Sequence, residues 1–191
     1  MKLSIRSLAL TTMLTVSSLS GAAAFAQDNP MVGGAAMYAD KNIIENAVNS
    51  ADHTTLVAAV KAAGLVDTLS GEGPFTVLAP TNEAFDALPA GTVETLLKPE
   101  NKEMLSTILA CHVIAAKALS TDIVGMVKDD GGEHMVDTVG GCKLTLKTTA
   151  DGGVTVTDEN GTTANVTIAD VMQSNGVIHV IDAVLTPKSS M

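Results

Sequence analysis

The segment from Val177 to Leu185 is apolar at both alternating sets of positions, and only His179 and Asp182 interrupt it. A strand with this pattern has to be covered on both faces, because leaving either face open would expose apolar side chains to water. The segment therefore predicts a central strand in a sheet with packing layers on both sides. It also raises the question of whether His179 performs chemistry or belongs to the core.

The rest of the chain changes from helical to alternating patterns along its length. Asn160-Gly161 lies between two strand patterns and predicts a hairpin with a type I′ turn. The order of the patterns predicts a single α+β domain. The expected helices are residues 42–50, 54–63, 65–69, 83–88, 91–97 and 102–110, and the expected strands are residues 75–79, 135–139, 143–148, 154–157, 163–168 and 177–185.

Local signals mark the ends of two of these helices. Asp52 or Thr54 is placed to cap the start of the helix at residues 54–63, and Gly64 is placed to end it. Thr81 follows the end of a strand pattern and is placed to cap the helix that comes next.

The first 26 residues have the pattern of a secretory signal peptide. Lys2 and Arg6 give a positive start, an apolar stretch from Leu8 to Leu19 follows, and Ala24-Phe25-Ala26 is typical of a cleavage site. We therefore expect cleavage after Ala26 and a secreted or periplasmic protein.

The remaining chain divides into a short leader and one domain. Residues 27–40 contain a proline and two adjacent glycines before the first helical pattern, so we expect a flexible leader. Residues 41–188 then form a single domain that is long enough to bury a core. No second long apolar run follows Ala26, so membrane insertion is not expected.

The chain is strongly acidic, with 11 basic and 21 acidic residues and a formal net charge of −10. Removing the signal segment takes away two basic residues and no acidic ones, which leaves a charge of −12. Such a surface repels phosphate backbones and anionic headgroups, so nucleic acid is not an expected partner.

Two cysteines are present, Cys111 and Cys142. Export to an oxidising compartment favours a disulfide between them, and the alternative is a pair of buried free thiols. In the chain-entropy model, closing a loop of about 32 residues stabilises the fold by about 3.5 kcal/mol. Their spacing is not that of a CxxC pair, so the sequence gives no support to a thioredoxin-like function.

The histidines and serines form none of the common catalytic patterns. No HExxH zinc helix, GxSxG elbow or phosphate loop is present, so we expect no enzymatic activity and no cofactor. His112 and His179 lie in apolar segments and would bind a metal only if the fold brought them together. The other interpretation is that each makes hydrogen bonds inside the core.

Three stretches together resemble the fasciclin (FAS1) domain family. "FTVLAPTNEAF", residues 75–85, is similar to the family's first motif, and "NGVIHVIDAVLTP", residues 175–187, is similar to its second. "LACHVIAAK", residues 109–117, is similar to the segment between them, with Cys111 in place of the usual tyrosine and His112 retained. A disulfide from Cys111 to Cys142 would tie the helical part to the sheet and would partly replace the packing that the tyrosine provides in the family.

The resemblance implies a β-wedge or sandwich of about seven strands with several surrounding helices. It also implies a non-catalytic adhesion module. In animal members a Pro-Asp-Ile-Met segment before the second motif is linked to integrin binding, and "ADVM" occupies that place here. Asp170, Val171 and Met172 are therefore our candidate partner-binding residues. The resemblance gives a structural role, through caps and core hydrogen bonds, to the motif residues Thr81, Asn82, Asp86, His112 and His179.

Two functional hypotheses follow. The first is a secreted or periplasmic adhesion module that contacts a protein or glycan on a cell surface, host or matrix. The second is a periplasmic protein that binds a small molecule or a metal through His112 and His179. The sequence leaves the partner's identity and the oligomeric state open, together with the use of the N-glycosylation sequons at Asn160 and Asn165.

Overall fold

A computed structural model describes residues 29–188 of the chain. The expected signal peptide at residues 1–26 lies outside this range. Within residues 29–188, no helix is both long enough and apolar enough to cross a membrane.

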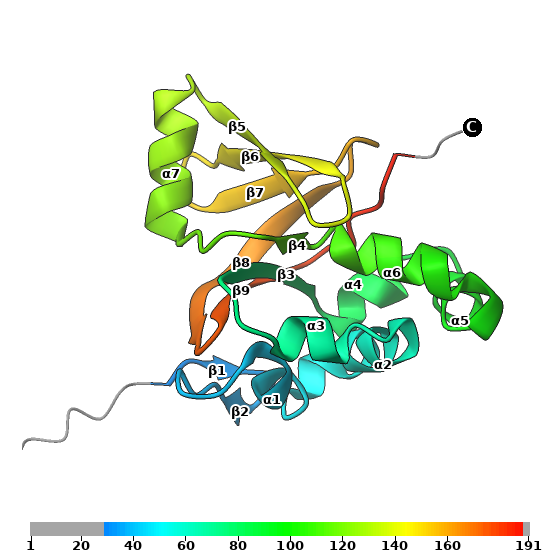
Figure 1. The fold of residues 1–191 in the computed structure, drawn as a ribbon. Coiled ribbons are helices and arrows are strands. Elements are labelled where there is room, and N and C mark those ends of the chain that lie inside the picture. The colour runs from blue at the N-terminus through cyan, green and yellow to red at the C-terminus, as the bar shows by residue number, and fades with distance from the viewer. Residues whose placement is uncertain (1–28, 189–191) are drawn as a thin grey trace, which may run out of the picture.

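The protein is built on one seven-stranded sheet, shown in Figure 1. In spatial order the strands are β4 (Val113–Ile114), β3 (Phe75–Pro80), β9 (Gly176–Ile181), β8 (Thr163–Gln173), β7 (Val154–Thr157), β6 (Lys143–Thr148) and β5 (Glu133–Asp137). β3 and β9 are parallel, and every other neighbouring pair is antiparallel. All six residues of β9 are buried between β3 and β8, which confirms the predicted central strand.

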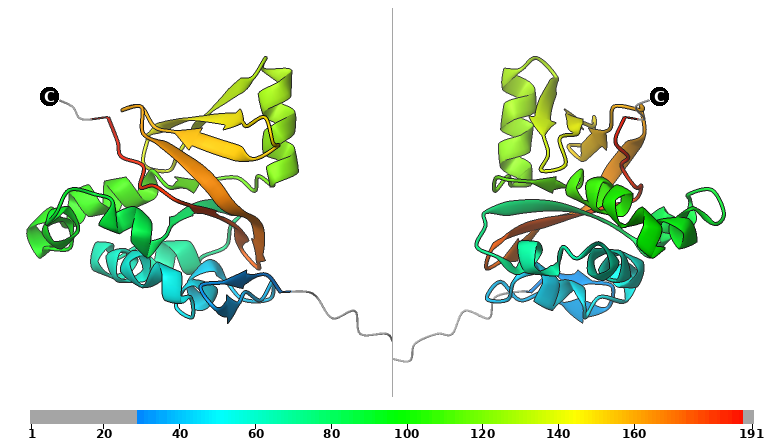
Figure 2. Two further views of the ribbon diagram at one scale, coloured as in Figure 1. Left: turned by 180° about the vertical axis from the view of Figure 1, so that it is seen from behind. Right: turned by 45° about the vertical axis from the view of Figure 1, so that its right-hand side comes forward.

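A helical layer covers one face of β3 and β9 (Figure 2). Ile178 and Val180 of β9, with Val77 and Ala79 of β3, pack against this layer because alternate residues of a strand point to the same face. The helices are α1 (Ile43–Ala47), α2 (Thr54–Ala63), α3 (Val66–Ser70), α4 (Asn82–Asp86), α5 (Thr92–Leu96) and α6 (Lys102–Ala110), with 3₁₀ turns at Ala51–His53 and Pro99–Asn101.

The opposite face of β3 and β9 packs on a second core. Leu78 and Ile181 face Ile123 and Val127 of α7 (Ser120–Asp129), together with apolar residues of β6 and β7. We did not predict α7, although Ile123 and Val127 lie one turn apart and give a helical signal. This helix between the strands completes the α+β architecture expected from the sequence.

The segment predicted to be a flexible leader differs from that prediction over residues 29–40. Two short strands, β1 (Met31–Val32) and β2 (Ala35–Ala36), form a hairpin, and Val32 is buried in the helical-layer core. Gly33 has a φ of 57°, and its carbonyl accepts a hydrogen bond from Ala51 N at 3.1 Å. The glycines that suggested flexibility make a turn instead, so the folded unit begins before residue 41.

The predicted disulfide between Cys111 and Cys142 is present, with 5.3 Å between the two Cα atoms. Cys111 directly follows α6 and Cys142 directly precedes β6, and both are buried. Beside the bridge, Val139 N–H donates to the Val113 carbonyl at 2.8 Å. The helical part and the far end of the sheet are therefore joined both covalently and by backbone hydrogen bonds.

The predicted hairpin at Asn160-Gly161 connects β7 and β8, but its turn is not type I′. Asp158 N–H donates to the Thr162 carbonyl at 2.9 Å, and Gly161 has a φ of 88°. Asn160 lacks the positive φ that a type I′ turn requires at its first central residue. The loop is the three-residue kind that ends in a left-handed glycine.

Candidate partner-binding site

The candidate segment "ADVM" lies on β8 at a bulge. β8 pairs with β9 through Ile168 and Val180 and then through Val171 and Ile178, so β8 has one extra residue between the two pairs. Asp170 sits in this bulge with a φ of 59°, a value that is uncommon for a residue with a side chain. The bulge turns the Asp170 carboxylate towards the start of α7.

Asp170 is tied to the fold through that carboxylate. Its Oδ1 accepts a hydrogen bond from Ser120 N at 2.7 Å, and its Oδ2 accepts one from the Ser120 hydroxyl. A carboxylate at the first turn of a helix satisfies free N–H groups and interacts favourably with the helix dipole. Asp170 therefore holds α7 against the sheet, so its carboxylate is not free for a partner.

His179 makes backbone hydrogen bonds through both ring nitrogens. Its Nδ1 accepts a hydrogen bond from Asp170 N at 3.3 Å, and its Nε2 lies 2.9 Å from the Ala118 carbonyl. The second contact requires a proton on Nε2, so the ring is the neutral Nε2–H tautomer. His179 thus supports the bulge from within the core, as the interpretation of a core histidine expects.

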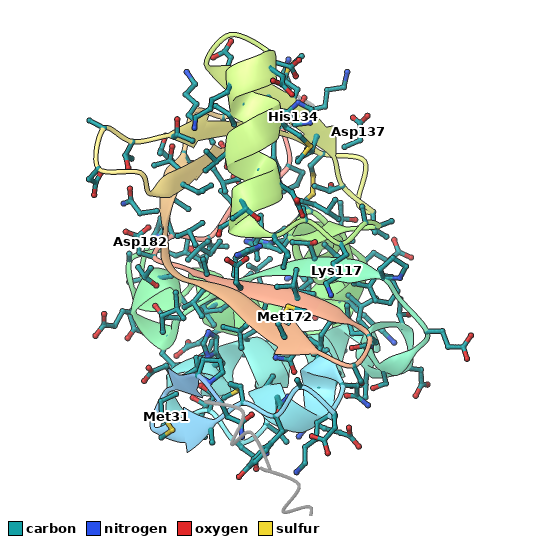
Figure 3. The ribbon with its side chains drawn as sticks, turned by 90° about the vertical axis from the view of Figure 1, so that its left-hand side faces the viewer. Met31, Lys117, His134, Asp137, Met172 and Asp182 are labelled. Atoms are coloured by element: carbon teal, nitrogen blue, oxygen red, sulfur yellow. A yellow bond between two sulfur atoms is a disulfide. The ribbon has the colours of Figure 1, made fainter. Side chains whose placement is uncertain are left out.

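The other two residues of the candidate set differ from each other. Val171 is fully buried in the helical-layer core, so it is not available to a partner in this structure. Met172 is partly exposed on the outer side of β8, and Figure 3 shows it on the same face as Lys117. The candidate surface therefore reduces to Met172 and the exposed groups around it.

An open cavity of about 540 Å³ is lined by Gln173, the residue that follows Met172 in the chain. The loop at residues 70–74 and the turn at residues 173–176 form it, with Asn42 and Lys117 at its sides. Its lining includes one acidic group, Glu72, and one basic group, Lys117, both exposed. Such a mixture of charges and amides suits a polar partner group with both donors and acceptors.

Asn175 fixes the shape of this cavity. Its Nδ2 donates to the Leu69 and Gly71 carbonyls at 2.8 and 2.9 Å, and its Oδ1 accepts from Ile43 N at 3.1 Å. Gly176 is needed next to it, because a Cβ there would collide with the Phe75 carbonyl oxygen. The Asn175 amide thus joins three segments that are distant in sequence, at residues 43, 69–71 and 175.

The first-motif residues have separate roles. Thr81 caps α4, since its hydroxyl accepts a hydrogen bond from Ala84 N at 3.3 Å. Asn82 reaches α2, where its Oδ1 accepts from Thr55 N at 3.0 Å, so it provides the cap expected from Asp52 or Thr54. Within residues 29–188, neither side chain makes a hydrogen bond to a histidine.

Asp86, the third of these motif residues, is exposed, and its side chain makes no hydrogen bond within residues 29–188. The structure therefore gives no support to the structural role expected of Asp86.

His112 is buried and is held by the backbone on both sides. Its Nδ1 lies 2.8 Å from the Ile108 carbonyl, and Leu185 N–H donates to its Nε2 at 2.9 Å. The ring is therefore neutral with its proton on Nδ1. Burial disfavours the charged form and lowers the pKa of His112 to about 4, although the hydrogen bond to Ile108 opposes this shift.

The polar groups that could bind a metal or carry a glycan are already engaged. His112 and His179 each use both ring nitrogens, and residues 29–188 contain no cluster of three or more ligands suited to a metal ion. In the sequons, the Asn160 amide donates to Thr186 and Pro187, and the Asn165 amide donates to Asp182.

Comparison with known proteins shows similarity over most of the chain. The fasciclin domain family model matches residues 51–187. Protein sll1483 of Synechocystis sp. is 48% identical over 161 residues, which are 84% of this chain and 82% of that protein. The cell surface glycolipoprotein MPB83 of Mycobacterium bovis is 35% identical over 173 residues, which are 87% of this chain and 70% of that protein.

Two longer proteins are similar to this chain over part of their length. Transforming growth factor-beta-induced protein ig-h3 of Sus scrofa is 39% identical over 139 residues, which are 71% of this chain and 18% of that protein. A FAS1 domain pair from the insect cell adhesion molecule fasciclin I has the same fold, with a TM-score of 0.67 and 18% identity. That match covers 78% of this chain and 51% of the pair, so the chain spans about half of its length. This chain belongs to the fasciclin domain family.

Proposed function

We propose that this protein is an exported, non-catalytic interaction module that contacts a protein or glycan on a cell surface or in a matrix. The observation that carries the proposal is the match to the fasciclin domain family over residues 51–187. The proposal is supported by the similarity of this chain to a cell surface glycolipoprotein and to a domain pair of a cell adhesion molecule. The secretory pattern of residues 1–26 supports export.

We place the contact surface around Met172 and the adjoining cavity. Met172 offers a flexible apolar side chain that adapts to different partner shapes. Beside it, Lys117 and Glu72 offer opposite charges at the cavity wall. A partner that inserts a polar group into the cavity and packs an apolar group on Met172 fits both features.

A capture experiment tests this placement. The mature protein, with its disulfide kept intact, is immobilised and incubated with envelope extract from its source. The same protein is also applied to a glycan array. We expect saturable binding that falls at least tenfold in both Met172→Asp and Lys117→Glu. The control is Met104→Asp on α6, a methionine that is more exposed than Met172, at 57%, and does not line the cavity.

Two outcomes count against the proposal. Absence of saturable binding to any surface protein or glycan contradicts the proposal that this protein is an interaction module. Equal loss of binding in Met104→Asp and Met172→Asp removes only the placement of the contact surface, because it shows a nonspecific effect of added charge.

A second candidate function rests on the cavity volume. About 540 Å³ lies within the range of small-molecule sites, so the same cavity suits a periplasmic small-molecule-binding protein. Native mass spectrometry of protein purified from its own source separates the two functions. A stoichiometric bound mass that is lost in Lys117→Glu supports the second function, and a clean apo mass counts against it.

A further inference from the structure

The outer edge of β5 has no neighbouring strand within residues 29–188. Thr138 and Cys142 form a pair at the end of the β5–β6 ladder in which the Thr138 N–H donates to the Cys142 carbonyl at 2.9 Å, so the Thr138 N–H points towards β6. Because such pairs alternate along a ladder, the N–H and C=O groups of Glu133, Met135 and Asp137 point away from β6. A row of free backbone donors and acceptors therefore runs along this edge.

The same three residues carry exposed side chains. Met135 is 68% exposed, the most open of the large apolar side chains in the described part of the chain. Glu133 and Asp137 flank it on the same face of the strand, and both are exposed. The edge thus presents an acidic, an apolar and an acidic side chain in alternation.

The neighbouring strand shows which side chains complement this pattern. Glu133 lies opposite Lys147, with 2.9 Å between Oε2 and Nζ, and Asp137 lies opposite Lys143. β6 thus places a base opposite each acid of β5, as favourable cross-strand pairs require. A strand added on the free side of β5 would lie next to the same three side chains. It would therefore need a basic residue opposite Glu133, an apolar residue opposite Met135 and a basic residue opposite Asp137.

We propose that the outer edge of β5 binds an extended segment of another protein in which basic, apolar and basic side chains alternate on one face. Backbone hydrogen bonds to the free groups of β5 provide the attachment, and pairing with Glu133, Met135 and Asp137 provides the selectivity. This surface is separate from the proposed site at Met172, as Figure 3 shows for the labelled Asp137 and Met172.

A second copy of this chain fits the edge poorly. Antiparallel pairing of two β5 strands about Met135 places Glu133 of one copy opposite Asp137 of the other, and like charges directly opposite are destabilising. The net charge of −10 adds a general repulsion between copies. The charges therefore favour a basic partner over self-association.

The test uses the full folded protein and a defined peptide, acetyl-Thr-Lys-Thr-Val-Thr-Lys-Thr-amide, followed by amide NMR. We expect saturable shifts confined to β5 and its flanks, with slowed exchange of the Glu133, Met135 and Asp137 amides. The same peptide with glutamate in place of lysine is the control and is expected not to bind. Failure of the lysine peptide to bind at millimolar concentration, or equal binding of both peptides, overturns the proposal.

Two variants separate strand addition from simple charge attraction. Met135→Pro removes an outward N–H and leaves the bonds to β6 intact, so it is expected to abolish binding, whereas Met135→Thr retains the backbone and most of the binding. The double variant Glu133→Lys with Asp137→Lys reverses both charges of the edge, so it is expected to bind the glutamate peptide and no longer to bind the lysine peptide. Unchanged binding in folded Met135→Pro, or no exchange of preference in the double variant, overturns the proposal.

Discussion

The stability of this protein is expected to fall in mildly acidic solution because of His112. In the unfolded chain its imidazole takes up a proton near its ordinary pKa of 6.5, whereas in the folded protein burial keeps it neutral down to about pH 4. Between these values the unfolded state binds more protons, so the free energy of unfolding decreases as the pH falls. At 1.36 kcal/mol per pH unit, the full separation corresponds to about 3 kcal/mol.

The structure explains why the folded state resists protonation. A proton on Nε2 would face the Leu185 N–H, which donates to that nitrogen at 2.9 Å. Protonation therefore breaks this hydrogen bond and leaves a charge among buried neighbours. The stabilising contribution is fully present above about pH 6.5 and is lost progressively towards pH 4.

Urea denaturation at several pH values between 7 and 4 measures this effect in the wild type and in His112→Asn, which stays neutral throughout. Other titrating groups, including His53, are common to both proteins and cancel in the comparison. The wild type is expected to lose about 3 kcal/mol more than the variant over this range. Equal pH dependence of the two proteins, or a His112 pKa near 6.5 by NMR in the folded state, refutes the reasoning.

Two further predictions concern the β9 core. His179→Ala leaves the Asp170 N–H and the Ala118 carbonyl without partners, so the free energy of unfolding should fall by about 1–3 kcal/mol; an unchanged melting temperature would contradict this. Gly176→Ala forces β9 away from β3, so the free energy of unfolding should fall by about 1–3 kcal/mol. Gly125→Ala in α7 is the control: an added Cβ meets nothing there, so the free energy of unfolding should rise by about 0.5–1 kcal/mol. Equal effects of the two alanine variants in urea denaturation would rule out the collision.

The long periodic elements could be predicted from the sequence because their signals are local. The helix at residues 54–63 and the strand at residues 143–148 have the predicted bounds, since apolar spacing and end residues define both. β4 and the β1–β2 pair were not predicted. Each strand has two residues, too few to show a period, and depends on pairing with a distant partner.

The candidate site was predicted less well because it depends on which groups meet. The resemblance directed attention to Asp170, Val171 and Met172, but the bulge in β8 turns the first towards Ser120 and the core encloses the second. A bulge adds one residue to one strand only, and the sequence pattern does not reveal where that happens. The roles of Asn82 and Asn175 likewise come from contacts with distant segments.

By itself, the sequence determined that this chain has an apolar central strand, an α+β order of elements and the fasciclin motifs. These features depend on the type and spacing of residues that lie within a few positions of one another, so they can be recognised without the fold. Only the tertiary structure decided that His179 has no free ring nitrogen and that, of Asp170, Val171 and Met172, Met172 alone is neither buried nor bonded to Ser120. It also decided that β5 lies at the end of the sheet, with no neighbouring strand on its outer side within residues 29–188. Burial, hydrogen-bond partners and strand order are relations between distant segments, and they exist only when the chain is folded.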